Sequence, residues 1–102
     1  YSVAYINRGN AYDDAGNFAQ AISSYNIGIS INPKSAEGYY NRGVAYQGQN
    51  RYTEAISDYT AAIQVNPNYA SAYKNRSIMY DKTGQKQKSQ ADLLKYNQLK
   101  TQ

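Results

Sequence analysis

The sequence repeats itself with a period of 34 residues. Shifting it by that length places residues 5–9 (YINRG) on residues 39–43 (YYNRG) and on residues 73–77 (YKNRS). Over one full period, residues 2–35 and 36–69 are identical at 13 of 34 positions. A fixed period of this length is the signature of stacked structural repeats, each of which buries its apolar face against its neighbours. We therefore expect an array of repeats instead of a fold around one central core.

Each period contains two stretches with the apolar spacing of an amphipathic helix. In the second period, Tyr39, Gly43 and Tyr46 recur every three or four residues, and a second stripe begins at Tyr52 after a Gly-Gln-Asn turn. An Asn-Pro pair closes the second stretch of the first two periods, because proline cannot continue a helix. We predict helices at about residues 3–15, 18–31, 36–48, 52–65, 70–82 and 86–99.

This pattern resembles the tetratricopeptide repeat (TPR), a 34-residue helix–turn–helix unit. The middle repeat has the family's signature residues at Tyr39, Gly43, Tyr46, Tyr52, Ala55, Tyr59, Ala62 and Pro67. The first repeat matches at the equivalent positions, whereas the third keeps the pattern only in its first half. The resemblance implies an all-α fold, a right-handed α-solenoid of three antiparallel helix–turn–helix hairpins, with Asn-Arg-Gly as the local variant of the repeat.

The repeats predict a single domain that covers the whole chain. Its boundaries are 1–102, with repeats at 2–35, 36–69 and 70–102. In the last predicted helix, Lys86, Gln90 and Asn97 replace the apolar residues of the earlier repeats. Polar residues at these positions predict a degenerate capping helix with a solvated outer face and no repeat packed on it. The inner face of this helix keeps Leu93, Tyr96 and Leu99 and is expected to pack through them.

The composition argues against catalysis. The sequence has no cysteine and no histidine, which removes thiolate nucleophiles, imidazole bases and the usual zinc ligands. The close acidic pair, Asp13 and Asp14, consists of adjacent residues, which point in different directions on a helix. No glycine-rich phosphate loop is present. We expect a protein that is not an enzyme and that requires no cofactor and no metal.

The net charge of +4 is concentrated in the third repeat, which contains seven basic and two acidic residues. Such a cluster is a solvated end face or a site for an anionic partner. Nucleic acid and membrane are not expected as partners, since no aromatic residues are interleaved among Lys86, Lys88 and Lys95. We expect a cytoplasmic location, an expectation that a targeting segment ahead of Tyr1 would change.

The resemblance implies a protein–protein interaction module that holds an extended peptide or a partner helix in a concave groove. The first helix of each repeat would line that groove. The candidate peptide-binding residues are Asn7, Asn10, Asp13, Glu37, Tyr40, Asn41, Val44, Gln47, Lys74, Asn75, Ile78 and Lys82. Tyr40 lies outside the pattern of large core residues and is a suitable anchor. Acidic residues in the first repeat and basic residues in the third would orient a dipolar peptide.

Asparagine recurs once per repeat at the same position, as Asn7, Asn41 and Asn75. A carboxamide both donates and accepts hydrogen bonds, so a row of them can pair with the backbone of an extended peptide. This resembles the asparagine ladder of some superhelical TPR proteins. The alternative is that Asn-Arg-Gly is a structural variant in which the asparagine binds water or a neighbouring helix. Both interpretations remain open.

Chaperone-linked members of the family hold the acidic C-terminus of a partner with a carboxylate clamp. Asn10 and Asn41 match that pattern, but the three basic positions are occupied by Ile6, Ser71 and Asn75. Recognition of a chaperone tail by that mechanism is therefore not expected. The alternative function is a scaffold or a self-associating adaptor that uses the exposed N-terminal face, which leaves a homo-oligomer open.

An arginine also recurs once per repeat, as Arg8, Arg42 and Arg76, where the family usually has an apolar residue. Arginine can lay its aliphatic stem over apolar neighbours while its head stays polar. Asp58 and Asp92, from the second helices of their repeats, are the expected ion-pair partners of Arg42 and Arg76.

Overall fold

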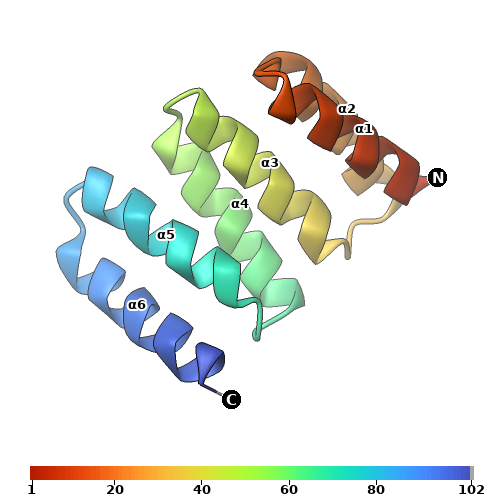
Figure 1. The fold of residues 1–102 in the computed structure, drawn as a ribbon. Helices are drawn as coiled ribbons and strands as arrows, with labels where there is room; N and C mark the ends of the chain where they lie inside the picture. Colours follow the sequence, from red (N-terminus) through yellow and green to blue (C-terminus); the bar gives the residue numbers. More distant parts are fainter. Residues whose placement is uncertain (102) are drawn as a thin grey trace.

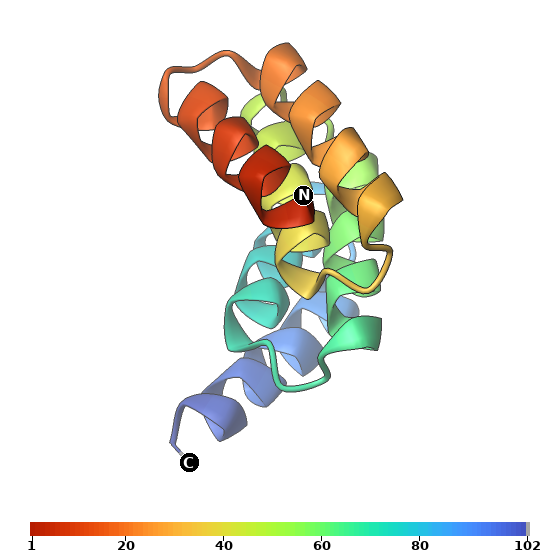
Figure 2. The same cartoon turned by 90° about the vertical axis from the view of Figure 1, so that its right-hand side faces the viewer.

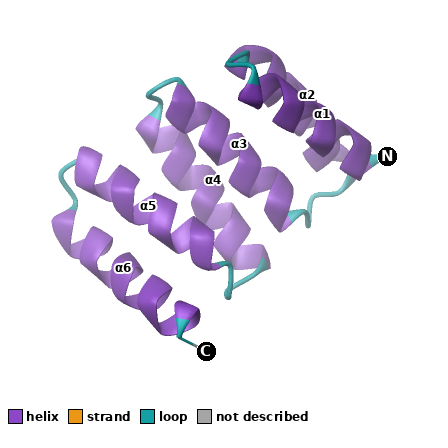
Figure 3. Ribbon diagram, viewed as in Figure 1, coloured by secondary structure: helices purple, strands orange, loops and turns teal. Residues whose placement is uncertain are grey.

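The computed structural model describes residues 1–101, which form three antiparallel helical hairpins. The helices are α1 (Ser2–Asp14), α2 (Phe18–Ile31), α3 (Ala36–Gly48), α4 (Tyr52–Val65), α5 (Ala70–Lys82) and α6 (Lys86–Lys100). The described residues contain no strand (Figure 3). Gln102, the last residue of the predicted domain, lies outside the described range.

The hairpins stack side by side into a two-layer solenoid. In Figure 1, α1 and α3 lie in front of α2 and α4, and α6 lies beside α5. Figure 2 shows the same stack from the side, with the two termini at opposite ends. Each hairpin touches the next mainly through its second helix, α2 against α3 and α4 against α5, while the first helices also meet, as between α1 and α3. The fold is therefore the all-α solenoid of helix–turn–helix repeats that the sequence predicts.

The turn within each hairpin has a left-handed residue at one fixed position. That residue is Gly16 in the first hairpin (φ 80°), Asn50 in the second (φ 59°) and Gly84 in the third (φ 76°). Asparagine is among the few residues besides glycine that adopt this conformation readily. In the second hairpin, therefore, Asn50 makes the turn, while Gly48 remains inside α3 and packs against Phe18.

Glycine allows the two helices of a hairpin to approach over a buried tyrosine. A Cβ atom on Gly43 would lie 2.7 Å from Cε1 of Tyr59, which is fully buried. Gly9 and Tyr25 form the same pair in the first hairpin. In the third hairpin both partners change, to Ser77 and Leu93. A larger residue on α5 is thus matched by a smaller one on α6, which preserves the fit between the helices.

The core is divided between successive hairpins. The first cluster joins α1, α2 and α3 through Ile6, Ala21, Ile22, Tyr25, Ile29 and Ala45. The second joins α3, α4 and α5 through Ala55, Tyr59 and Met79, with partly buried Tyr40, Val44, Tyr46, Tyr52 and Ile56 around them. Each cluster thus includes one residue of the following hairpin, Ala45 or Met79, beside the buried tyrosine.

Leu93 differs from the expectation that it packs in the interior. It occupies the position of Tyr25 and Tyr59, yet its side chain is 46% exposed. The two tyrosines are covered by α3 and α5 of the following hairpins, whereas no described helix follows α6. The polar residues Lys86, Gln90 and Asn97 are also exposed on this helix.

Two bidentate ion pairs join the helices of the second and third hairpins. Arg42 donates from Nε and a terminal nitrogen to the two carboxylate oxygens of Asp58, at 2.8 and 2.7 Å. Arg76 binds Asp92 in the same way, at 2.7 Å for both bonds. Both aspartates are buried, so the predicted ion pairs are confirmed and largely shielded from water.

The same arginines also reach back to the preceding hairpin. The remaining terminal nitrogen of Arg42 donates to Oδ1 of Asn26 on α2 at 2.9 Å. That of Arg76 donates to Oγ1 of Thr60 on α4 at 3.0 Å. Each guanidinium therefore joins three helices and fixes the rotation of one hairpin against the next.

We predict that Asp58→Asn lowers the free energy of unfolding by about 2–4 kcal/mol, because it leaves the Arg42 guanidinium partly buried without its counter-ion. Urea denaturation monitored by circular dichroism measures the loss. The control is Glu54→Gln, which breaks the exposed Arg51–Glu54 pair, whose side chains are 50% and 43% exposed. That variant should change stability by less than about 0.5 kcal/mol. Equal losses in the two variants would contradict a special role for the buried pair.

We predict that Gly43→Ser lowers the free energy of unfolding by about 1–3 kcal/mol, because the new side chain collides with the ring of Tyr59. Combining it with Tyr59→Leu reproduces the pair found in the third hairpin. The two losses should then be less than additive, with a coupling of about 0.5–2 kcal/mol. Strict additivity in urea denaturation would show that the glycine is not required by the tyrosine.

Candidate functional site

All twelve predicted site residues lie on α1, α3 and α5, the helices of one layer (Figures 1 and 2). We call the surface that these helices present the α1/α3/α5 face. Its side chains come from three hairpins whose mutual rotation is fixed by the arginine contacts. The face is therefore a preformed surface. Some of its residues are engaged in contacts within the fold, and others have no partner in the described structure.

Tyr40 lies at the centre of an aromatic group between α3 and α5. Its ring is stacked on that of Tyr69, with centroids 5.0 Å apart, and is tilted against that of Tyr59 at 5.6 Å. Its hydroxyl accepts a hydrogen bond from Nδ2 of Asn75 at 3.0 Å. Tyr40 is thus half-buried and held in place, while part of its surface remains open.

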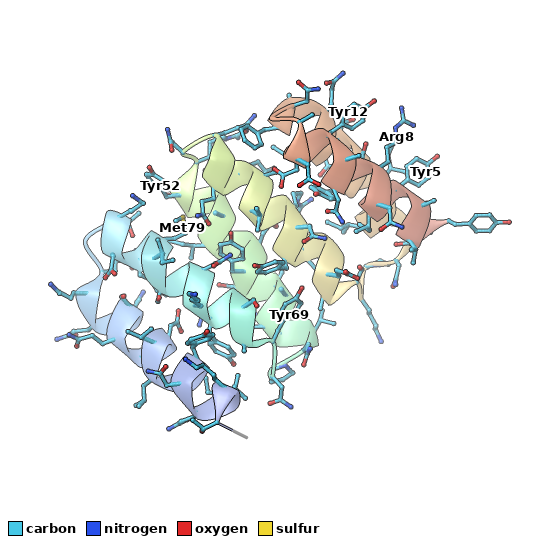
Figure 4. The ribbon with its side chains drawn as sticks, viewed as in Figure 1. Tyr5, Arg8, Tyr12, Tyr52, Tyr69 and Met79 are labelled. Atoms are coloured by element: carbon cyan, nitrogen blue, oxygen red, sulfur yellow. The ribbon has the colours of Figure 1, made fainter. Side chains whose placement is uncertain are left out.

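Tyr69 was not among the predicted site residues. Figure 4 shows it between α3 and α5, near the start of α5. Tyr69 occupies the N-cap position of α5. The N-cap of α3 is Ser35, whose hydroxyl accepts a hydrogen bond from the Gly38 N–H at 3.0 Å. Tyrosine cannot cap a helix in this way. A large aromatic residue at a capping position could have indicated, from the sequence alone, that Tyr69 has a role other than capping α5.

Burial keeps the hydroxyls of this group protonated. It raises the pKa of Tyr69 to about 12, with smaller contributions from Tyr40 and Glu37. It also raises the pKa of Tyr40 and of Tyr59, and the hydrogen bond from Asn75 opposes the rise in both. The three tyrosines therefore stay neutral to a higher pH than free tyrosine, which is itself neutral at physiological pH.

Two predicted site residues serve the core. Oδ1 of Asn10 accepts a hydrogen bond from the Tyr25 hydroxyl at 2.6 Å, and Oε1 of Gln47 accepts one from the Tyr59 hydroxyl at 2.8 Å. A buried tyrosine hydroxyl requires such a partner. Each amide still has its N–H groups, so both residues can present donors on the α1/α3/α5 face.

The three recurring asparagines do not have the same surroundings. Asn7 is exposed and Asn41 is half-buried, and neither side chain makes a hydrogen bond within the described part of the chain. Asn75 is engaged with Tyr40 across the junction between α5 and α3. One member of the row thus has a neighbouring helix as partner, and the other two are free for a ligand.

The acidic residues lie toward the N-terminal end of the face. Asp13 is half-buried, and burial raises the pKa of its carboxyl group, with a further contribution from Asp14 beside it. Glu37 is exposed in the first turn of α3.

The basic residues lie on α5 and rest on aromatic rings. Nζ of Lys74 is 5.6 Å from the centroid of Tyr96, and Nζ of Lys82 is 5.7 Å from that of Tyr52. Both lysines are exposed. The rings restrict where the two positive charges lie, a weak but favourable interaction.

The apolar residues of the face divide between core and surface. Ile78 is 37% exposed and Val44 is half-buried against the second core cluster. Ile6, which occupies a clamp position in the chaperone-linked relatives, is only 4% exposed and packs against Gly28 and Gly38. That position is therefore part of the core and does not contribute to a binding surface here.

The described residues contain no group of three or more side chains suited to hold a metal ion. None of the helices in residues 1–101 combines the length and the apolarity that crossing a membrane requires.

Comparison with known families identifies the fold. The family model described as tetratricopeptide repeat matches residues 36–69, and the one described as TPR repeat matches residues 9–50. The chain belongs to the tetratricopeptide repeat family. The TPR fold is a scaffold for protein interactions, and the chain is a protein–protein interaction module. No match was found among curated protein sequences.

Solved TPR structures superpose closely on the chain. The second TPR of Spaghetti (RPAP3), bound to the HSP90 peptide SRMEEVD, has a TM-score of 0.94 at 28% identity, and the match covers 96% of this chain and 91% of that one. MamA has a TM-score of 0.94 at 29% identity, and the chain spans 58% of its length. The first TPR of Spaghetti, also bound to that peptide, has a TM-score of 0.94 at 24% identity, with 96% and 78% covered.

We predict that this TPR domain loses stability as the pH rises from 10 toward 12. Unfolded Tyr69 ionises near its ordinary pKa of 10, whereas the folded residue ionises at about 12. Over this window the unfolded chain gives up a proton that the native state retains, so the stability present below pH 10 is lost.

Urea midpoints measured across this range should fall less steeply for Tyr69→Phe than for the parent protein, because the variant lacks the shifted hydroxyl. Tyr1→Phe is the control, since Tyr1 is 97% exposed and its hydroxyl meets water in both states. Parallel curves for the parent and Tyr69→Phe would contradict the prediction.

Proposed function

We propose that the chain binds an extended peptide of a partner protein along the α1/α3/α5 face, with the Tyr40–Tyr69 stack as its anchor. The stack carries the proposal, because it places an aromatic surface between two hairpins in a fixed orientation. An aromatic that is already ordered loses little conformational entropy when a ligand packs on it. An apolar side chain of the peptide is the natural occupant.

Polar groups on both sides of the stack suit a peptide backbone. Asn41, the residue that follows Tyr40 on α3, has a carboxamide without a partner in the described structure, and Asn7 offers another on α1. Such groups can satisfy the N–H and C=O groups of a bound extended chain, which would otherwise lose their hydrogen bonds to water.

The charge distribution supports one direction of binding. Asp13 and Glu37 lie toward the N-terminal end of the face, and Lys74 and Lys82 lie on α5. A peptide with basic residues toward α1 and acidic residues toward α5 would be favoured during encounter.

The second TPR of Spaghetti binds an acidic peptide, which is support by analogy for a peptide ligand. Ile6 is buried here, and Asn75 is engaged with Tyr40. We therefore propose that the partner is recognised through internal residues of its chain and not through a C-terminal carboxylate held by a basic clamp.

The test begins with peptides of about 12 residues selected from a random library on the intact protein. Their affinities for the parent, Asn41→Ala and Tyr40→Phe are then compared by fluorescence anisotropy. Loss of a buried hydrogen-bonding group should weaken binding about 5- to 30-fold in Asn41→Ala. Tyr40→Phe should weaken it less, because the ring remains.

Ser57→Ala, on the exposed side of α4, is the matched control and should bind as the parent does. Circular dichroism confirms that each variant is folded. If the selected peptides bind the Asn41 and Tyr40 variants as tightly as the parent, the α1/α3/α5 face is not the binding site.

A further inference from the structure

The three recurring arginines have different partners. Arg42 and Arg76 each hold a buried aspartate, whereas the residue at that position in the first hairpin is Ser24. Within residues 1–101, the Arg8 guanidinium makes a single side-chain hydrogen bond, to the Tyr12 hydroxyl at a long 3.5 Å. The first hairpin thus has the cation of the motif without its anion.

A hollow lies where the missing carboxylate would be. It has a volume of about 260 Å³ and is lined by Arg8, Tyr12, Gln20, Ser23, Ser24 and Ile27. Figure 4 shows Arg8 and Tyr12 projecting from the side of α1 that faces away from α3. This surface is the outer side of the first described hairpin, and it is separate from the aromatic group of Tyr40.

We propose that this hollow binds a carboxylate from an acidic side chain of a partner polypeptide. Arg42 and Arg76 show how the guanidinium of this repeat receives a carboxylate, through Nε and one terminal nitrogen in parallel. The planar fork of arginine matches a carboxylate in this geometry. Arg8 has the same backbone position in its hairpin and the same donors available.

The lining of the hollow fits an amino-acid side chain better than a free ion. Ser24 is buried, and its hydroxyl makes no hydrogen bond in the described structure, so it can donate to a second oxygen. Ile27 is 42% exposed beside it and offers an apolar contact to the methylene groups of an aspartate or glutamate. The only charge in the lining is that of Arg8, which balances one carboxylate and would leave a phosphate dianion undercompensated.

A second copy of this chain does not supply the ligand by continuing the stack. In the described junctions, the arginine also donates a hydrogen bond to a residue of the preceding hairpin, which is Asn26 for Arg42 and Thr60 for Arg76. The equivalent residue of α6 is Leu94, which has no acceptor. Stacking α6 of another copy on α1 would bury Arg8 against leucine, which disfavours that arrangement, and we therefore assign the carboxylate to a different polypeptide.

The first experiment tests whether the hollow accepts a carboxylate. Ser24→Asp restores the residue of the other two hairpins and should raise the midpoint of thermal unfolding by roughly 1–6 °C. The same substitution in an Arg8→Gln background should give no increase, because the partner is gone. A midpoint that is lowered, or changed equally in the two backgrounds, would overturn the proposal.

The second experiment tests binding directly by following the arginine Nε–Hε signals in two-dimensional NMR. The probe is the capped tripeptide acetyl-Leu-Glu-Leu-amide, with acetyl-Leu-Gln-Leu-amide as the neutral control, at constant ionic strength. The signal of Arg8 should shift with the Glu probe at least about fivefold more steeply than with the Gln probe. The signals of Arg42, Arg51 and Arg76, which are already paired, should respond weakly.

In Ser24→Asp the response of Arg8 should fall at least about fivefold, since the site is then occupied from within. Inorganic phosphate serves as a separate arm. A steeper response to phosphate than to the Glu probe would overturn the carboxylate assignment and favour a phosphate-bearing partner. Equal responses to the Glu and Gln probes, or an unchanged response in Ser24→Asp, would show that the hollow is not a carboxylate site. Asn41→Ala should leave all of these responses intact, which separates this site from the proposed peptide-binding face.

Discussion

Each of the two described junctions between hairpins depends on a guanidinium shared among three helices. Arg42 binds a buried carboxylate within its own hairpin and an amide oxygen on the preceding one, and Arg76 repeats the arrangement with a hydroxyl. Apolar packing alone tolerates small rotations between helices, because it is not directional. The five N–H donors of arginine lie in one plane, so satisfying three of them fixes both distance and rotation. The position of every side chain on the α1/α3/α5 face follows from that geometry.

Tyrosine hydroxyls provide a second layer of polar contacts, between the core and the surface. Tyr25 and Tyr59 fill the space above the glycines with apolar rings, but each ring ends in a hydroxyl that requires an acceptor. Asn10 and Gln47 supply it from the α1/α3/α5 face. Asn10 and Gln47 therefore stabilise the hairpins while their N–H groups stay available, so a substitution at either residue would change stability as well as any binding at this face.

Much of this fold follows from the sequence, since the 34-residue period fixes which residues are equivalent. The six helix ranges agree with the structure to within one residue at each end, and the aspartate partners of Arg42 and Arg76 are found correctly. These features depend on spacing along one hairpin. The exposure of Leu93 was not foreseen, because it depends on whether another helix covers α6.

The details of the candidate site depend on contacts between hairpins, which a linear pattern does not encode. The stack of Tyr40 on Tyr69 and the bond from Asn75 join residues from different repeats. The periodicity places Tyr40 and Asn75 on one face, but the distance between them results from the rotation of α5 against α3. The burial of Ile6, at a position that is a ligand contact in some relatives, has the same origin.

The acceptors for the two buried tyrosine hydroxyls come from non-equivalent positions. Asn10 lies one residue past Gly9, whereas Gln47 lies four residues past Gly43, about one helical turn further along. A residue in either of two adjacent turns can therefore accept the hydrogen bond from the buried tyrosine. In each repeat, the residue in the other turn does not have to be an acceptor. Selection can then alter that residue without destabilising the hairpin. A protein built from units of one fold can in this way acquire a surface that is not periodic, as recognition of a non-repetitive partner requires.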